Sequence, residues 1–190
     1  RNKKNVISGM VCEIIEASQN RIYPECAYFG SCSGCQWQHI SYPHQLELKR
    51  QIILDAFFLY DLLEGVPVLS VIPSNKEFEY RNHARFSVRF GGKMGFSNRI
   101  TRRFVKIDEC LIMHNRINET LSLLQNKVSE TTSISVRVGV KTNNILIQPK
   151  LLSSDIPIET GQKFYLEKLY GKEFRVASPS FFQVNIAQAE

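Results

Sequence analysis

The sequence has no apolar stretch near the ~20 residues that a transmembrane helix needs, and no hydrophobic run follows its basic N-terminus. A secretion signal would contain such a run. Its five cysteines are an odd number, so a framework of disulfides is not expected. We therefore expect a cytoplasmic protein without a membrane partner. The 190 residues, 43% of them hydrophobic, suffice for one sizeable core or two small ones. Because the chain begins without Met, we expect a piece of a longer protein.

Acidic residues are missing from the segment between Tyr80 and Ile107. The rest of the chain holds 16 basic and 18 acidic residues, so the positive excess lies in this segment. An alternating strand with a solvated outer face is one explanation. Passive surfaces usually mix both signs of charge, so we favour contact with the phosphates of a nucleic acid. The basic residues are Arg81, Arg85, Arg89, Lys93, Arg99, Arg102, Arg103 and Lys106.

Four cysteines have the spacing of a metal site. Cys26, Cys32 and Cys35 form a C-x5-C-x2-C loop of small residues, and Cys110 follows far downstream. Plant-type ferredoxins hold an iron–sulfur cluster with a similar spacing. A cluster in this place would join the N-terminal loop to the middle of the chain.

Two other interpretations of these cysteines remain open from the spacing alone. Unrelated buried thiols are one, although Cys-x2-Cys beside glycines is rarely mere packing. Zinc is the second, because Cys32, Cys35 and Cys110 with His114 would form an acceptable tetrahedral set. The zinc set leaves Cys26 unused, whereas a cluster uses all four cysteines. Cys12 lies in an alternating segment and is expected to be a small hydrophobic residue.

The remaining pattern predicts an antiparallel α+β fold with two helices. Residues 6–16 are expected to form one or two strands, the end of a small barrel. Ser41 and Pro43 mark the start of a helix that Gly65 ends, and a second helix is expected over 115–128. Gly91-Gly92 and residues 142–144 mark the turns of two hairpins. The expected strands cover residues 66–72, 85–90, 93–98, 134–138, 145–148, 164–169 and 173–176.

The C-terminal segment F-F-Q-V-N is open to two interpretations. Phe181 and Phe182, followed by the amide of Gln183, could line a pocket for a planar ligand that forms hydrogen bonds. They could equally form a buried strand with a cap. The residue types alone do not decide between these alternatives.

Together these fragments resemble the iron–sulfur branch of the RNA uracil-C5 methyltransferases, which form 5-methyluridine. The resemblance follows the order of the chain over nearly its whole length, and Ser33 departs from it because the family usually has Gly there. The cysteine set and the F-F-Q-V-N segment are together its most specific parts. The matching residues are C-x5-C-S-G-C-Q-W-Q-H-I-S-Y with Gln45 and Lys49, Tyr80-Arg81-Asn82, Gly95-Phe96, Asp108-Glu109-Cys110 and the closing S-P-S-F-F-Q-V-N-I-A-Q-A-E.

The resemblance implies roles for individual residues. It assigns a 4Fe–4S cluster to Cys26, Cys32, Cys35 and Cys110, and leaves His114 out. It also places Gln183 at the S-adenosylmethionine site, and Phe181 or Phe182 beside a target base extruded from its stack.

In this family a cysteine thiolate adds to carbon 6 of the uracil, and carbon 5 then takes the methyl group. The nucleophile and the base lie in a C-terminal domain beyond residue 190. No catalytic residue is therefore expected within the 190 residues, and this chain alone is expected to be inactive.

We therefore interpret the chain as the RNA-binding and iron–sulfur part of such an enzyme. Residues 1–20 would end a TRAM-type barrel, 21–177 would form the central domain, and 178–190 would begin the catalytic domain. The expected partner is RNA, 23S ribosomal rather than transfer RNA, and the expected state is a monomer. The alternative is a zinc-stabilised RNA-binding module without enzymatic activity. The residues expected to bind RNA are Arg81, Arg85, Arg89, Arg99, Arg102, Arg103, Phe181 and Phe182.

Overall fold

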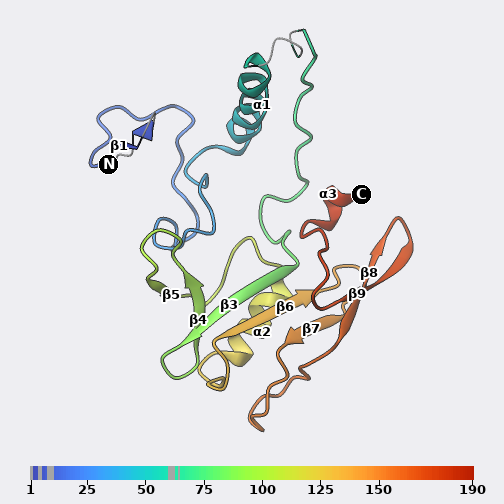
Figure 1. Cartoon of the computed structure of the whole chain (residues 1–190). Coiled ribbons are helices and arrows are strands. Elements are labelled where there is room, and N and C mark those ends of the chain that lie inside the picture. Colours follow the sequence, from blue (N-terminus) through green and yellow to red (C-terminus); the bar gives the residue numbers. More distant parts are fainter. Residues whose placement is uncertain (1, 4–5, 8–10, 60–62, 64) are drawn as a thin grey trace.

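A computed structural model describes residues 2–3, 6–7, 11–59, 63 and 65–190 of the chain. It has the antiparallel α+β fold that the sequence predicts, and Figure 1 shows its elements. Within the described residues, no helix is long and apolar enough to cross a membrane. The strands are β1 (Asn2–Lys3), β2 (Val6–Ile7), β3 (His83–Arg89), β4 (Lys93–Ser97), β5 (Phe104–Lys106), β6 (Ser133–Val138), β7 (Ile145–Gln148), β8 (Phe164–Leu169) and β9 (Lys172–Ala177), and the helices are α1 (Tyr42–Phe58), α2 (Asn115–Leu124) and α3 (Ile186–Ala189).

The centre of the molecule is a five-stranded antiparallel sheet in the order β5-β4-β3-β6-β7, and α2 packs against one of its faces (Figure 1). Helical spacing places Ile117, Leu121 and Leu124 on one side of α2, and all three are fully buried. They meet the alternating side chains of β3 and β6, among them Phe86 and Ile134. Burying each of these side chains contributes about 1.5–3 kcal/mol, so this layer is the main core.

Glycines shape the β3–β4 hairpin and its contact with β5. The turn between β3 and β4 contains Gly91 and Gly92, whose φ angles are +72° and +87°. That left-handed backbone favours glycine, as a short hairpin turn requires. Gly95 on β4 serves a different purpose, because a Cβ there would run into the carbonyl group of Val105 on β5. The predicted hairpins over 85–98 and 134–148 are both present.

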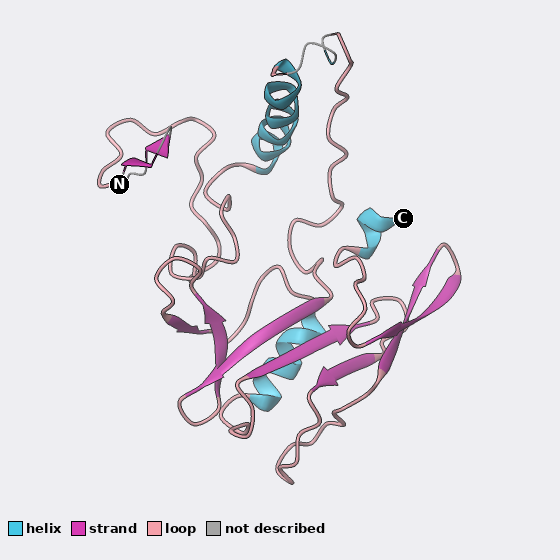
Figure 2. Cartoon of the chain, viewed as in Figure 1, coloured by secondary structure: helices cyan, strands magenta, loops and turns pink. Residues whose placement is uncertain are grey.

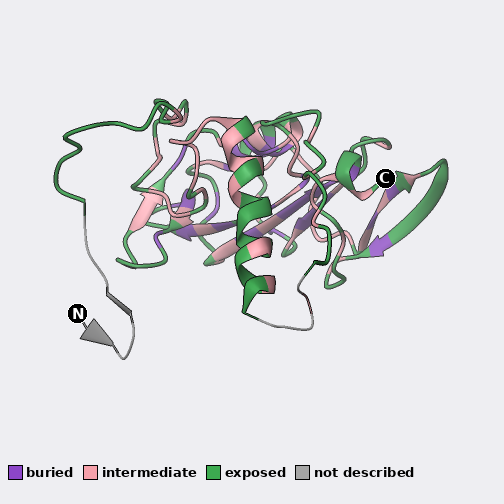
Figure 3. Cartoon of the chain, turned by 90° about the horizontal axis from the view of Figure 1, so that it is seen from above, coloured by how far each residue is buried: buried purple, intermediate pink, exposed green. Residues whose placement is uncertain are grey.

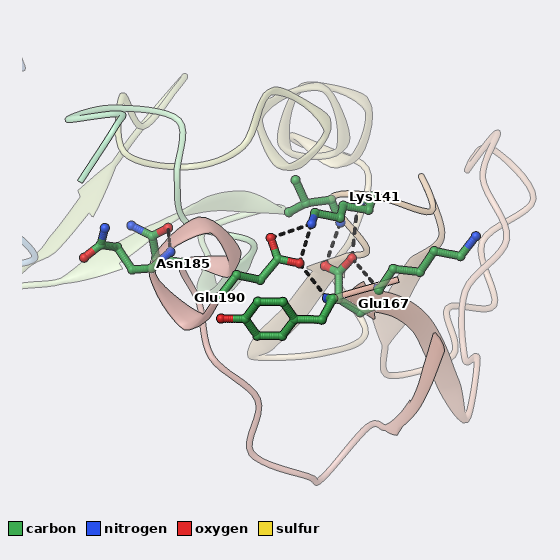
Figure 4. Close-up of polar contacts among 8 residues, drawn as sticks. Lys141, Glu167, Asn185 and Glu190 are labelled. Carbon is green, nitrogen blue, oxygen red and sulfur yellow. Dashed lines mark hydrogen bonds and ion pairs between the residues drawn. The ribbon is translucent and has the colours of Figure 1, made fainter. Parts of the chain in front are cut away.

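A second hairpin layer, formed by β8 and β9, is joined to the sheet by a buried carboxylate. Glu167 is fully buried and accepts the backbone N–H groups of Val140 and Lys141, at 2.8 and 3.1 Å. The Lys141 ammonium also contacts the carboxylate of Glu190 at 2.6 Å (Figure 4). Tyr170, in the turn of the β8–β9 hairpin, donates its N–H to the same carboxylate at 2.8 Å. The C-terminal turn α3 is thereby tied to the hairpin and to the β6–β7 connection.

Helix α1 stands apart from the sheet, and an extended segment returns beside it (Figure 2). None of its residues is buried, and the ribbon of α1 is exposed or intermediate along its length in Figure 3. Residues 66–72 were expected to form a strand, and that prediction is wrong. They lie beside α1, where Arg50 donates to the Val68 carbonyl at 2.9 Å, and pair with no strand among the described residues. Residues 66–72, although apolar and rich in β-branched side chains, therefore remain outside any β-sheet.

Five other details differ from the predictions. α1 ends at Phe58 rather than at Gly65, and α2 ends at Leu124 rather than at 128. Phe90 does not continue the buried face of β3, because it lies in the turn with φ +46° and is 76% exposed. Within residues 6–16, the described strand is Val6–Ile7 and residues 8–10 lie outside the described ones. Cys12 is exposed rather than packed as a small hydrophobic residue.

Candidate functional site

The four predicted cysteines line one cavity. Cys26, Cys32 and Cys35 enter it from the N-terminal loop, and Cys110 enters from the segment after β5. The volume of the cavity is about 330 Å³, the space of several water molecules. All four thiols are half-buried. The fold thus brings together residues that stand 75 or more positions apart in the sequence.

Side-chain hydrogen bonds hold the cysteine loop against the sheet. The Tyr28 hydroxyl donates to the carboxylate of Asp108 at 3.2 Å and accepts the backbone N–H of Asp108 at 3.0 Å. At the end of β4, Asn98 donates its amide to the Ser31 carbonyl at 2.8 Å. Asn98 is 8% exposed, so this bond is sheltered from water. The loop is therefore fixed at two points, one on each side of β5.

Ser33 adds a third attachment. Its hydroxyl accepts the backbone N–H of Arg99 at 2.7 Å. The sequence suggested only that a serine here could alter the local turn. In the structure the hydroxyl makes a bond that the hydrogen of a glycine could not make.

Cys110 is fixed by α2. The side-chain amide of Asn118 accepts the N–H of Cys110 at 3.0 Å and donates to its carbonyl group at 3.2 Å. Because β5 ends at Lys106, Cys110 lies in the connection to α2 rather than at the end of a strand. The paired bonds with Asn118 supply the order that a strand would otherwise provide.

Burial makes the thiols of Cys35 and Cys110 harder to ionise than that of an ordinary cysteine. The pKa of Cys110 is raised to about 11, first by burial and then by the nearby thiols of Cys35 and Cys26, while hydrogen bonds from the backbone of Ile112 and Met113 oppose the shift. The pKa of Cys35 is also raised, first by burial and then by Cys26 and Cys32, while a hydrogen bond from Gln38 opposes the shift. The mutual effects show that the thiols are close to one another. Raised pKa values are the opposite of what a nucleophilic cysteine needs.

The four thiols do not form a ready-made tetrahedral zinc site. Tetrahedral Zn–S bonds of ~2.3 Å would place sulfur atoms only about 3.8 Å apart. Among the described residues, no three His, Cys, Asp or Glu side chains are grouped so as to hold one metal ion. The thiolates of a 4Fe–4S cluster each bind a different iron and stand further apart.

His114 is also engaged elsewhere. It caps α2, where its Nδ1 accepts the N–H of Arg116 at 3.3 Å. It does not line the cysteine cavity, whose walls include residues 109–113. His114 therefore lies outside the cavity that the four cysteines share.

The predicted RNA-binding arginines divide into two groups. Arg81, Arg85 and Arg99 line the cysteine cavity. Arg89 lies at the far end of β3, and Arg102 and Arg103 lie in the β4–β5 turn. All three are exposed. The pattern of the sequence correctly places Arg85 and Arg89 on the exposed face of β3.

Asn82 connects the cysteine site to the C-terminal segment. It is 2% exposed, and its side-chain amide donates to the Gln183 carbonyl at 3.3 Å. Its backbone N–H donates to the Val184 carbonyl at 3.0 Å. The preceding residue, Arg81, donates its N–H to Ile112, two residues beyond Cys110, at 2.9 Å. One short stretch thus holds the segment of Cys110 on one side and the F-F-Q-V-N segment on the other.

A second cavity, of about 540 Å³, adjoins the cysteine cavity. It lies between the cysteine loop, the start of α1 and α3, and its walls include Trp37, Tyr42 and Tyr80. Cys35 lines both cavities, and so does Gln38, whose buried Oε1 has no hydrogen-bond partner among the described residues.

Comparison with known proteins identifies the relatives of this chain. A 23S rRNA (uracil(1939)-C(5))-methyltransferase of Legionella pneumophila is 34% identical over 134 residues, which cover 67% of this chain and 30% of that protein. The chain is homologous to the RNA uracil-C5 methyltransferases. An uncharacterized RNA methyltransferase of Prochlorococcus marinus is 26% identical over 99% of the chain and 58% of its own length. No protein-family profile matches the sequence.

A solved structure shares the fold. The Pyrococcus abyssi tRNA (uracil-54, C5)-methyltransferase, solved in complex with S-adenosyl-L-homocysteine, superposes with a TM-score of 0.69 at 20% identity. The match covers 93% of this chain and 50% of that one. The chain therefore spans only part of the length of these relatives. The matched share is 58% for the Prochlorococcus protein, 50% for the Pyrococcus protein and 30% for the Legionella protein.

In this homologue of the uracil-C5 methyltransferases, residues 181–185 do not form the buried strand that was one interpretation, and the two phenylalanine rings differ in exposure. Phe181 is 83% exposed, whereas Phe182 packs near Phe174 of β9, with ring centroids 6.1 Å apart. The side chain of Gln183 is exposed, while its backbone is held by Asn82. One ring and one amide therefore face solvent from an anchored backbone.

Several residues of the site escaped the sequence analysis. Asn98, Asn118 and Tyr28 orient the cysteine segments, but isolated polar residues carry no periodic signal. Asn82 stood inside a motif, although nothing in the motif revealed its partner. Tyr28, Asn82 and Asn98 each bond to a residue far away in the sequence, so these partners become visible only in the folded structure.

Proposed function

We propose that this chain supplies the RNA-binding and iron–sulfur part of an S-adenosylmethionine-dependent methyltransferase that forms 5-methyluridine in RNA. The single observation that carries the proposal is the convergence of Cys26, Cys32, Cys35 and Cys110 on one cavity. Homology to the RNA uracil-C5 methyltransferases supports the reaction class. We propose 23S ribosomal RNA as the substrate, because the Legionella relative is a 23S rRNA methyltransferase.

The four thiols would hold a 4Fe–4S cluster, which when bound would join the N-terminal loop to the connection before α2. Its role would be structural, because it would join two segments that lie far apart in the sequence and that meet through contacts such as the hydrogen bond from Tyr28 to Asp108. Binding would displace the thiol protons, as metal binding to cysteine generally does. None of these four residues is proposed as the catalytic nucleophile.

Arginine side chains around the cavity would contact RNA phosphates. Arg81, Arg85 and Arg99 border the cysteines, and the exposed Arg89, Arg102 and Arg103 extend the positive surface along β3 and the β4–β5 turn. The exposed ring of Phe181 would stack on an extruded base, and the amide of Gln183 would contact S-adenosylmethionine. The remainder of the enzyme would supply the nucleophile and the base.

The test uses the full-length enzyme and the 190-residue chain in parallel. With labelled S-adenosylmethionine and a 23S rRNA fragment, the full-length enzyme is expected to form 5-methyluridine. The isolated chain is expected to bind the same RNA without methylating it. Stronger competition by transfer RNA would reject the ribosomal assignment, and absence of RNA binding by both proteins would reject the proposal.

A further inference from the structure

A buried arginine on β6 lacks a counter-ion. Arg137 is 8% exposed and lies opposite His83 in the ladder between β3 and β6. Its Nη1 donates to the Ser180 carbonyl at 2.6 Å, and its side chain is also hydrogen-bonded to that of Tyr165 on β8, but its Nε is buried without a hydrogen-bond partner in the described part of the chain. No carboxylate of that part forms an ion pair with it. A charge buried without a partner is strongly unfavourable, so this arrangement calls for an explanation.

Two further arginines converge on the same place. The Nε of Arg81 donates to the backbone carbonyl of His83 at 3.1 Å. Arg85 follows two residues along β3, on the same face of the sheet as His83. Burial, then Arg137, Arg81 and Arg85 in that order, lower the pKa of His83 to about 4. Near neutral pH the imidazole is therefore uncharged, and the three arginines make the site strongly positive.

The neighbouring groups on this face do not neutralise the charge. Ser135 lies opposite Arg85, and its hydroxyl is 3.0 Å from the Nε2 of His83. The strand residues that share this face include no Asp or Glu. In the ladders from β5 to β6, they are His83, Arg85, Ser87, Arg89, Lys93, Gly95, Ser97, Phe104, Lys106, Ser133, Ser135 and Arg137.

A purely structural role does not account for Arg137. Bracing the Ser180 carbonyl and the Tyr165 hydroxyl requires only hydrogen-bond donors, which an uncharged amide would supply without burying a positive charge. The guanidinium is instead kept charged beside two others. A fixed, planar arginine fork is suited to the oxygens of a phosphate.

We propose that Arg81, Arg85 and Arg137, together with His83, form a binding site for one phosphodiester group of an RNA strand. The site lies on β3 and β6, where Tyr165 of β8 and the carbonyl of Ser180 contact Arg137. Arg137 contacts Ser180, which directly precedes Phe181. The bound phosphate would therefore be close to the nucleotide whose base meets Phe181, and in this respect the inference rests on the proposed function.

Inorganic phosphate is the first probe, because it tests the site without RNA, cluster or cofactor. Titration into the full-length protein is expected to shift the imidazole resonances of His83 and to raise its pKa, since a nearby anion favours the charged ring. Arg137→Gln and, separately, Arg85→Gln are expected to weaken phosphate binding at least fivefold. Lys172→Gln removes an equal charge on the β8–β9 hairpin and is expected to leave binding unchanged. Equal phosphate affinity in wild type and Arg85→Gln would overturn the site.

The salt dependence of RNA binding is the second measurement. Loss of one phosphate contact reduces the slope of log K against log salt by about 0.7–0.9, and this reduction is expected for both arginine variants. Melting curves show whether Arg137→Gln remains folded, and the exposed Arg85 gives an independent result if it does not. Phosphate binding without RNA binding would keep the site and reject the proposed function. RNA binding with an unchanged slope in folded variants would reject the site alone.

Discussion

The backbone N–H of Asn82 donates to the carbonyl oxygen of Val184 at 3.0 Å, which anchors the C-terminal segment beside the start of β3. The same residue holds Gln183 through its side chain. Its neighbour Arg81 is bonded to Ile112, close to Cys110. The cysteine site and the F-F-Q-V-N segment are therefore linked through two consecutive residues, Arg81 and Asn82.

Asn82→Ala should release the C-terminal segment. The substitution removes the side-chain bond to Gln183 at a buried position and leaves that carbonyl without its partner, which typically costs about 1–3 kcal/mol. Hydrogen exchange of residues 181–186 should become faster. Asn75→Ala, at an exposed position, is the matched control and should change neither quantity. Unchanged exchange in Asn82→Ala would show that the segment is held by other contacts.

Replacing His114 separates the two metal hypotheses. His114→Ala removes the side-chain cap of α2 and should lower the free energy of unfolding by about 1 kcal/mol. Because His114 does not line the cysteine cavity, the iron content should stay at the wild-type level. Metal analysis together with thermal unfolding measures both effects. Loss of bound metal in a folded His114→Ala protein would instead favour the zinc site.

The exposed turn between β4 and β5 should contribute to RNA affinity. Arg102→Glu combined with Arg103→Glu is expected to weaken RNA binding at low salt. Loss of two phosphate contacts should flatten the slope of log K against log salt by about 1.4–1.8. Lys168→Glu combined with Lys172→Glu changes the charge equally on the β8–β9 hairpin and serves as the control. Identical slopes for the two double variants would make this turn an ordinary charged surface.

His83 should make the protein less stable in mild acid. Its pKa is about 4 in the folded protein against an ordinary value of 6.5, so the unfolded chain binds more protons between these pH values. Stability is therefore highest above pH 6.5 and falls as the pH drops towards 4. Allowing for the partial exposure of the ring, the loss is on the order of 1–2 kcal/mol. Denaturant unfolding across this range, in phosphate-free buffer, should show a shallower decline for His83→Gln. An equal decline in stability for the wild type and His83→Gln would show that His83 is not the cause.

The sequence predicted those features whose signals are local. Alternation and glycine turns located the two hairpins of the sheet, and the spacing of Cys26, Cys32 and Cys35 with Cys110 identified residues that do share a cavity. The apolar residues 66–72 look like a strand, but strand formation also needs a free edge to pair with. They lie beside α1 instead.

Long-range pairs could not be predicted in the same way. Ser33 meets Arg99 and Arg137 meets Ser180 only because the loop and the hairpin fold back onto the sheet. Neither a serine in a loop nor an arginine in a strand reveals such a partner. The charge pattern likewise overlooked Arg137, because it stands outside the basic segment that ends before Asp108.

The central claim is that Cys26, Cys32, Cys35 and Cys110 act together as the ligands of one iron–sulfur cluster. Its most direct test is metal and sulfide analysis of anaerobically purified protein, compared with Cys110→Ser and with Cys12→Ser, a cysteine outside the cavity. The account predicts about four irons and broad visible absorbance in wild type and Cys12→Ser, with a marked loss in Cys110→Ser. One zinc per chain in a colourless wild-type protein would contradict it.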